Sequence, residues 1–131
     1  MKRSHYAKVG SIVQVLHPEI FKDILSSIQP ELNDQSLIQK FYDHYSKIHD
    51  LNKDYRQRLI FISSILNLFS PSSLVYGERV TPGVLTTLQQ CFGKNNKQSI
   101  GIYVYQTPAY FKNQAFKEEV ENVSKLFREV I

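Results

Sequence analysis

The sequence predicts a mainly α protein, a compact single-domain bundle of five or six helices. Apolar residues recur at intervals of three and four in several segments, which is the spacing of one face of an α-helix. Residues 59 to 69 are apolar on nearly every side, as is typical of a central helix surrounded by its neighbours. A chain of 131 residues is the size of one domain and can bury a core without disulfides or metal.

The first thirty residues predict a polar start followed by one clear helix. We expect a flexible basic arm over residues 1–8 and a single globular domain over residues 9–131. Residues 9–16 are rich in β-branched side chains and suit either a strand or the approach to a helix. Pro18 fits the first helical position, and Pro30 ends the segment. Its apolar side chains at helical spacing are Ile20, Phe21, Ile24, Leu25 and Ile28.

Two further helices are expected in the middle of the chain. The first begins near Asn33 and Asp34, which are good capping residues. The second begins near Asp50 or Asn52 and contains the apolar run. The segment Ser70-Pro71-Ser72-Ser73 should stop it, because proline does not continue a helix.

A fourth helix is predicted between a threonine-proline start and a glycine stop. Residues 74–80 precede it as an extended segment or loop. Thr81 is the expected cap, Pro82 occupies the first helical position and Gly93 terminates the helix. Its buried face is expected to contain Val84, Leu85, Leu88, Cys91 and Phe92.

Residues 97–106 fit either a helix or a strand, because so short an apolar run has no decisive period. If residues 99–106 are extended, they could pair with residues 9–16 and 74–80, and the fold would be α+β with a small sheet. A final helix is expected to begin at Thr107-Pro108. Its apolar residues are Phe116, Val120, Val123, Phe127 and Val130.

The charge is unevenly distributed along the chain. The net charge is +4, yet no acid occurs between Arg79 and Lys117, a stretch that contains five cations. A wider window, residues 55–117, contains seven cations and a single acid, Glu78. Such an asymmetry predicts positive potential over one part of the surface, which suits an acidic partner such as nucleic acid.

The acid-free stretch contains a helix, a glycine and a polar segment that leads into an apolar one. Over residues 82–106 this order resembles the helix-turn-helix class of DNA-binding domains, in which a second helix enters the major groove. The turn is one residue longer than usual, and Lys94 stands where an apolar residue is common. The resemblance implies that residues 99–106 are helical and that the protein binds DNA, and a regulatory role is compatible with it.

The expected nucleic-acid site follows from this resemblance. Lys97 would contact phosphate or guanine, and Gln98 an adenine edge. Arg56 and Arg58 would add phosphate contacts. The predicted binding residues are Arg79, Lys94, Asn95, Asn96, Lys97, Gln98, Ser99 and Lys112.

Aromatic residues alternate with these cations and suit a second kind of nucleic acid. Tyr103, Tyr105, Tyr110 and Phe111 lie close in sequence to lysines. Bases of a single strand stack on such rings, although aromatic side chains more often pack in a core.

No pattern of catalytic or metal-binding residues is present, so the sequence predicts neither an enzyme nor a cofactor or metal. The alternative function is a non-enzymatic protein-protein interaction module or inhibitor. The lone cysteine, Cys91, favours a reducing, cytoplasmic location. No apolar run is long enough for a membrane span, so no membrane partner is expected. A homodimer is compatible with the sequence.

Overall fold

The fold is mainly α, as the sequence predicts. A computed structural model describes residues 5–93 and 97–131, with side chains described over 7–93 and 100–131. These residues contain eight helices, more than the five or six expected, and no strand. The helices are α1 (His5–Leu16), α2 (Pro18–Ile28), α3 (Ser36–Ser46), α4 (Tyr55–Phe69), α5 (Pro71–Tyr76), α6 (Val84–Phe92), α7 (Lys97–Phe111) and α8 (Gln114–Val130).

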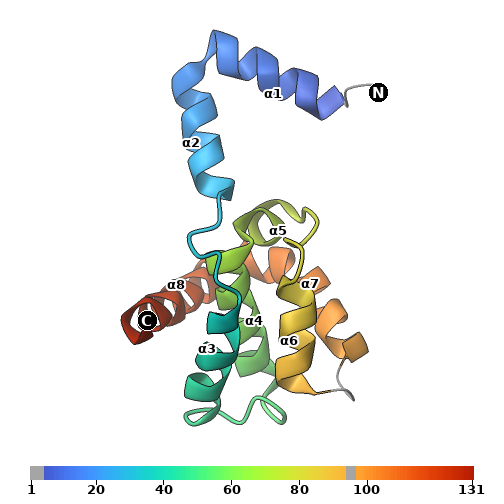
Figure 1. Cartoon of the computed structure of the whole chain (residues 1–131), viewed down its shortest axis with the longest axis vertical. Helices are drawn as coiled ribbons and strands as arrows, with labels where there is room; N and C mark the ends of the chain where they lie inside the picture. Colours follow the sequence, from blue (N-terminus) through green and yellow to red (C-terminus); the bar gives the residue numbers. More distant parts are fainter. Residues whose placement is uncertain (1–4, 94–96) are drawn as a thin grey trace.

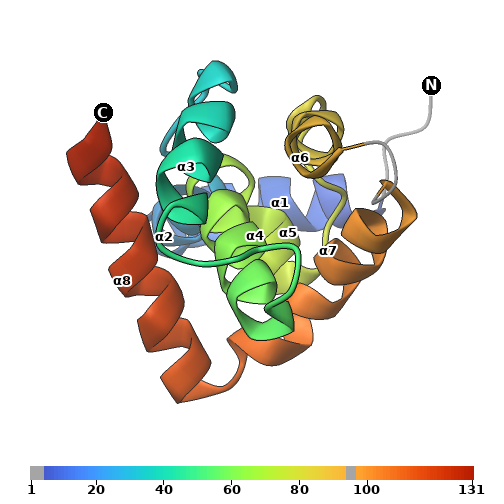
Figure 2. The ribbon, with the colours of Figure 1, turned by 90° about the horizontal axis from the view of Figure 1, so that it is seen from below.

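Helix α4 is the centre of the bundle, as its all-round apolar pattern predicts. It packs against α3, α5, α7 and α8, and Figures 1 and 2 show these helices around it. Every residue from Leu59 to Leu66 is buried. Beside α4, Phe41 of α3 stacks on Phe127 of α8 with ring centroids 4.7 Å apart. The apolar faces of α3, α4 and α8 are therefore buried in the bundle.

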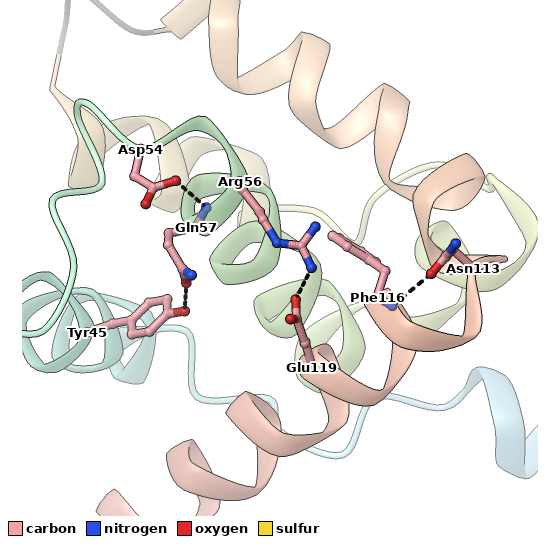
Figure 3. A network of polar contacts seen from close by, with 7 residues as sticks. All are labelled: Tyr45, Asp54, Arg56, Gln57, Asn113, Phe116 and Glu119. Atoms are coloured by element: carbon pink, nitrogen blue, oxygen red, sulfur yellow. Dashed lines mark hydrogen bonds and ion pairs between the residues drawn. The ribbon is translucent and has the colours of Figure 1, made fainter.

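Polar contacts fix the ends of these helices (Figure 3). The Asp54 side chain caps α4 by accepting a hydrogen bond from the backbone N–H of Gln57, 3.1 Å away. The Tyr45 hydroxyl of α3 donates to Oε1 of Gln57 at 2.5 Å. Asn113 caps α8 by accepting from the N–H of Phe116 at 3.1 Å. Both caps satisfy backbone donors that a helix start leaves without partners.

The α+β alternative is wrong, because all three segments proposed for the sheet contain helix. Residues 9–16 belong to α1, residues 74–76 to α5 and residues 99–106 to α7. The expectation that residues 74–80 are extended fails over its first half for a local reason. Pro71 starts a short helix, and Gly77, at φ 69°, ends it in the left-handed conformation that glycine adopts readily.

The expected helix start at Thr107-Pro108 is also wrong, because α7 continues through both residues. Proline lacks the N–H that would bond to the carbonyl of Val104. The Thr107 hydroxyl donates to that carbonyl instead, at 2.8 Å. This bond offsets the missing backbone donor, and α8 begins only after Asn113.

Helices α1 and α2 form an extension, called the arm below, that leaves the bundle. Figure 1 shows α2 leading away from α5 and α1 standing clear of the bundle at its far end. None of the residues described in α2 is buried, and the described residues of α1 are exposed or half-buried. Residues 5–8 of the expected flexible segment form the start of α1. The core of the protein is therefore built from α3 to α8.

Candidate nucleic-acid interface

The first helix of the candidate interface, α6, begins two residues later than the Thr81-Pro82 pattern predicts. Gly83, at φ 92°, precedes the first helical residue, Val84. Thr81 does not cap the helix. Its N–H and hydroxyl both donate to the Ser70 hydroxyl, at 2.9 and 3.0 Å. Thr81 thus ties the segment before α6 to the end of α4.

Gly93 ends α6, as predicted. Its φ of 87° and ψ of 166° lie in a region that residues with a side chain rarely adopt. Residues 94–96, which include three predicted contacts, Lys94, Asn95 and Asn96, lie outside the described part of the chain. The backbone is helical again from Lys97, so a second helix follows α6 along the chain.

Helix α7 has a buried face and an exposed face. Ile100, Tyr103, Thr107 and Phe111 point into the bundle and are buried. This face packs against α4, α5 and α6. Tyr105 is 86% exposed. The helix therefore packs with one side and presents the other to solvent, which is what a groove-binding helix requires.

A groove of about 520 Å³ runs beside the exposed face of α7. It brings Arg79, from the segment before α6, together with Lys112, which follows α7 directly. Tyr105 and Gly101 of α7 also line it, and Glu78 adds one acid. Two of the predicted residues thus share one surface feature although they are more than thirty positions apart.

The remaining predicted residues of the site belong to the first turn of α7. The backbones of Lys97, Gln98 and Ser99 are helical there. Their side chains lie outside the described atoms, so their predicted contacts with bases remain predictions.

Arg56 and Arg58, expected as additional phosphate contacts, are engaged in the bundle. Arg56 pairs with Glu119 of α8 at 2.5 Å (Figure 3). Arg58 donates to the carbonyls of Leu51 and Asn52 and to the Tyr103 hydroxyl, at 2.5 to 2.6 Å. A guanidinium with three such acceptors is a structural element that joins the loop before α4 to α7.

The aromatic residues near the lysines divide between the core and the surface. Tyr103 and Phe111 are buried, so they cannot stack on a base. Tyr105 and Tyr110 are exposed. Tyr105 is the aromatic side chain that lines the groove beside Arg79 and Lys112.

Two side chains of nucleophilic type, Cys91 and Ser64, are held in the packed bundle. Burial, and next the Asp43 carboxylate, raises the pKa of the Cys91 thiol to about 11. The thiol therefore stays protonated at neutral pH, and a protonated thiol is a poor nucleophile. The Ser64 hydroxyl donates to the Ile60 carbonyl at 2.7 Å, where α4 packs on α8. Within the described residues, no group of three His, Cys, Asp or Glu side chains could hold a metal ion.

Sequence reasoning missed two features of the groove. The sequence did not show that Tyr105 is exposed and Tyr103 buried, because the two residues belong to one short run without a decisive period. Glu78 was counted only as an isolated acid, although it lines the same groove as Arg79. In a helix, residues two positions apart face different directions, so the helical assignment of α7 would have separated the two tyrosines.

Comparisons with protein-family models, with curated proteins and with solved structures found no match to this chain. No helix in the described ranges combines the length and the apolar character needed to cross a membrane.

Proposed function

We propose that the protein binds nucleic acid, and DNA in particular, through residues 82–106. The observation that carries the proposal is the exposed face of α7, which lies beside a groove lined by Arg79 and Lys112. Phosphate contacts by such cations supply most of the affinity of DNA-binding proteins. The polar residues at the start of α7, Lys97 to Ser99, would then read the bases.

Reversal of the charge on the predicted phosphate contacts tests this proposal. The probe is a fluorescein-labelled DNA duplex of mixed sequence, and the readout is fluorescence anisotropy at several salt concentrations. For Arg79→Glu/Lys112→Glu we expect weaker binding at every salt concentration, and a plot of log K against log [salt] less steep by about 2, because two phosphate contacts are lost. Lys94→Glu/Lys97→Glu should have a similar effect.

The matched control reverses two exposed lysines elsewhere, in Lys47→Glu/Lys125→Glu. Lys47 follows α3 directly and Lys125 lies on α8, and neither residue lines the groove beside α7. The net charge changes by the same amount in the test and control variants. A difference in DNA affinity between them must therefore come from where the charges lie. A complex that resists salt, or equal losses in variant and control, would contradict the proposal.

The role of Tyr105 distinguishes duplex from single-stranded DNA. A base stacked on an exposed ring contributes about 1–3 kcal/mol of binding free energy. If the protein binds single strands, Tyr105→Ala should weaken binding to a labelled oligothymidine about 5- to 150-fold and leave duplex binding nearly unchanged. If it binds duplex through α7, the single-strand affinity should be low in both proteins.

A protein partner is the second candidate function, and the exposed apolar arm favours it. Acidic residues of α8 could also dock on a basic surface of another protein, although Glu119 is already paired with Arg56. Weak retention on heparin would favour this function over DNA binding. A cytoplasmic location belongs to either proposal, because the lone Cys91 suits a reducing compartment.

A further inference from the structure

The arm exposes more apolar surface than monomeric soluble proteins usually do. On α1 the exposed apolar residues include Val9, Ile12, Val15 and Leu16, and on α2 they include Ile20, Ile24 and Leu25. Contiguous apolar surface of this kind marks an interaction site in a protein that folds normally. Helix α2 packs on α1 and on α5. Val13, Phe21 and Ile28 are half-buried, whereas the apolar residues named above remain exposed.

The chain exposes more surface than a typical folded monomer of its mass, and the excess is large enough for a dimer interface. The chain exposes 8604 Å². A folded monomer of 15.3 kDa is expected to expose about 7,100 Å², so the excess is about 1,500 Å². A stable interface of standard size buries about 800 Å² on each partner. Because none of the residues described in the arm is buried, the arm can supply that area.

The charges of the arm favour a second copy of the chain over a lipid surface. The charged residues described in the arm are Lys8, Glu19, Lys22 and Asp23, so the two signs cancel. Helices that lie on membranes are rich in Lys and Arg on their polar face, whereas α2 has one cation and two acids there. A neutral arm of mixed charge does not repel its own copy, and a two-fold axis lets each lysine face an acid of the other copy.

We infer that the protein is a homodimer whose two arms pack on each other through the exposed apolar residues of α1 and α2. The two bundles would then stand on either side of the paired arms. This inference does not rest on DNA binding. Its test measures mass in the absence of nucleic acid, so either proposal can fail without the other.

The test is the mass of the full chain by light scattering during gel filtration and by sedimentation over a range of concentrations. We expect the wild type to have twice the chain mass of 15.3 kDa. Ile20→Glu/Ile24→Glu should raise the dimer dissociation constant at least about 100-fold, because two side chains that become buried in the dimer would carry a charge. The milder Ile24→Ser should raise it about 10-fold. Circular dichroism checks that each variant keeps its helices.

The matched control places the same charges on two isoleucines outside the arm. Ile20 and Ile24 are 53% and 45% exposed, and Ile48 and Ile131 are each 59% exposed. Ile48→Glu/Ile131→Glu should therefore remain a dimer. A wild type that is monomeric at all concentrations would overturn the inference, and so would a dimer that persists in the arm variants. Flotation of a monomeric wild type with vesicles of phosphatidylcholine and phosphatidylserine would overturn it in favour of a lipid surface.

Discussion

At the scale of single residues, cations close in sequence have different roles. Arg56 and Arg58 lie on the first turns of α4, but Arg56 forms an exposed ion pair and Arg58 bonds to two loop carbonyls and a tyrosine hydroxyl. Arg79 and Lys112 instead line the groove beside α7. The charge count of the sequence cannot separate these roles, because it contains no information on which acceptors fold next to each cation.

Substitution of the two arginines should separate their contributions to stability. Arg58→Ala leaves the Leu51 carbonyl and the Tyr103 hydroxyl without their donor, so we expect the free energy of unfolding to fall by about 2 kcal/mol. Arg56→Ala removes only an exposed ion pair and should cost less than about 1 kcal/mol. Urea denaturation followed by circular dichroism measures both. Equal losses would contradict the structural role of Arg58.

At the scale of helices, α7 shows how a local signal for a helix start can be overridden. Thr107-Pro108 has the pattern of a start, yet Ile100, Tyr103 and Phe111 are buried on one face of a single helix. The burial of that face stabilises a helix that continues through the proline, and the Thr107 hydroxyl satisfies the Val104 carbonyl. A pattern read along the chain cannot weigh this tertiary contribution.

A double-mutant cycle tests the coupling between Thr107 and Pro108. Thr107→Val leaves the Val104 carbonyl without a donor and should lower the free energy of unfolding by about 1–3 kcal/mol. In the Pro108→Ala background the backbone N–H of residue 108 bonds to that carbonyl, so the same substitution should cost under about 0.5 kcal/mol. Thermal or urea unfolding of the four proteins gives the coupling free energy. Equal costs in the two backgrounds would show that the hydroxyl does not replace the missing bond.

At the scale of the whole molecule, the bundle and the arm differ in burial. Tyr45 lies where α3, α4 and α8 meet, with its ring 5.8 Å from Phe61 and 5.9 Å from Phe127. Burial, and next the Glu119 and Asp54 carboxylates, raises the pKa of Tyr45 from 10.0 to about 12. The charge state of this one group therefore affects the stability of the entire bundle.

The pH dependence of unfolding follows from this raised pKa. The folded state holds the Tyr45 proton more tightly than the unfolded chain, so its contribution is complete below pH 10 and is lost as the pH rises to about 12. We expect the free energy of unfolding to fall by roughly 2–3 kcal/mol over this range. Tyr45→Phe should show a smaller fall. The raised pKa of Cys91 also lowers the free energy of unfolding between about pH 9 and 11, but the wild type and Tyr45→Phe share this contribution. Parallel curves for the two proteins would contradict the assignment.

The elements that local patterns identify were predicted well. Helices α2, α3, α4 and α8 follow from apolar residues at helical spacing, and the end of α6 follows from Gly93. The caps were placed less well. Asp50 and Asn52 were expected to start α4, whereas Asp54 caps it. Several polar residues near a helix start can accept hydrogen bonds from its free backbone N–H groups. The packing of α4 decides which residue forms the cap.

The sequence alone predicted a mainly α fold with α4 at its centre, and it determined a stretch from Arg79 to Lys117 that holds five cations and no acid, because periodicity and composition are properties of the chain. Only the tertiary structure decided three other features. It made residues 97–111 one helix, it joined Arg79, Tyr105 and Lys112 in one groove, and it left the apolar faces of α1 and α2 exposed. Each of these depends on which distant residues cover a surface, and no local pattern contains that information.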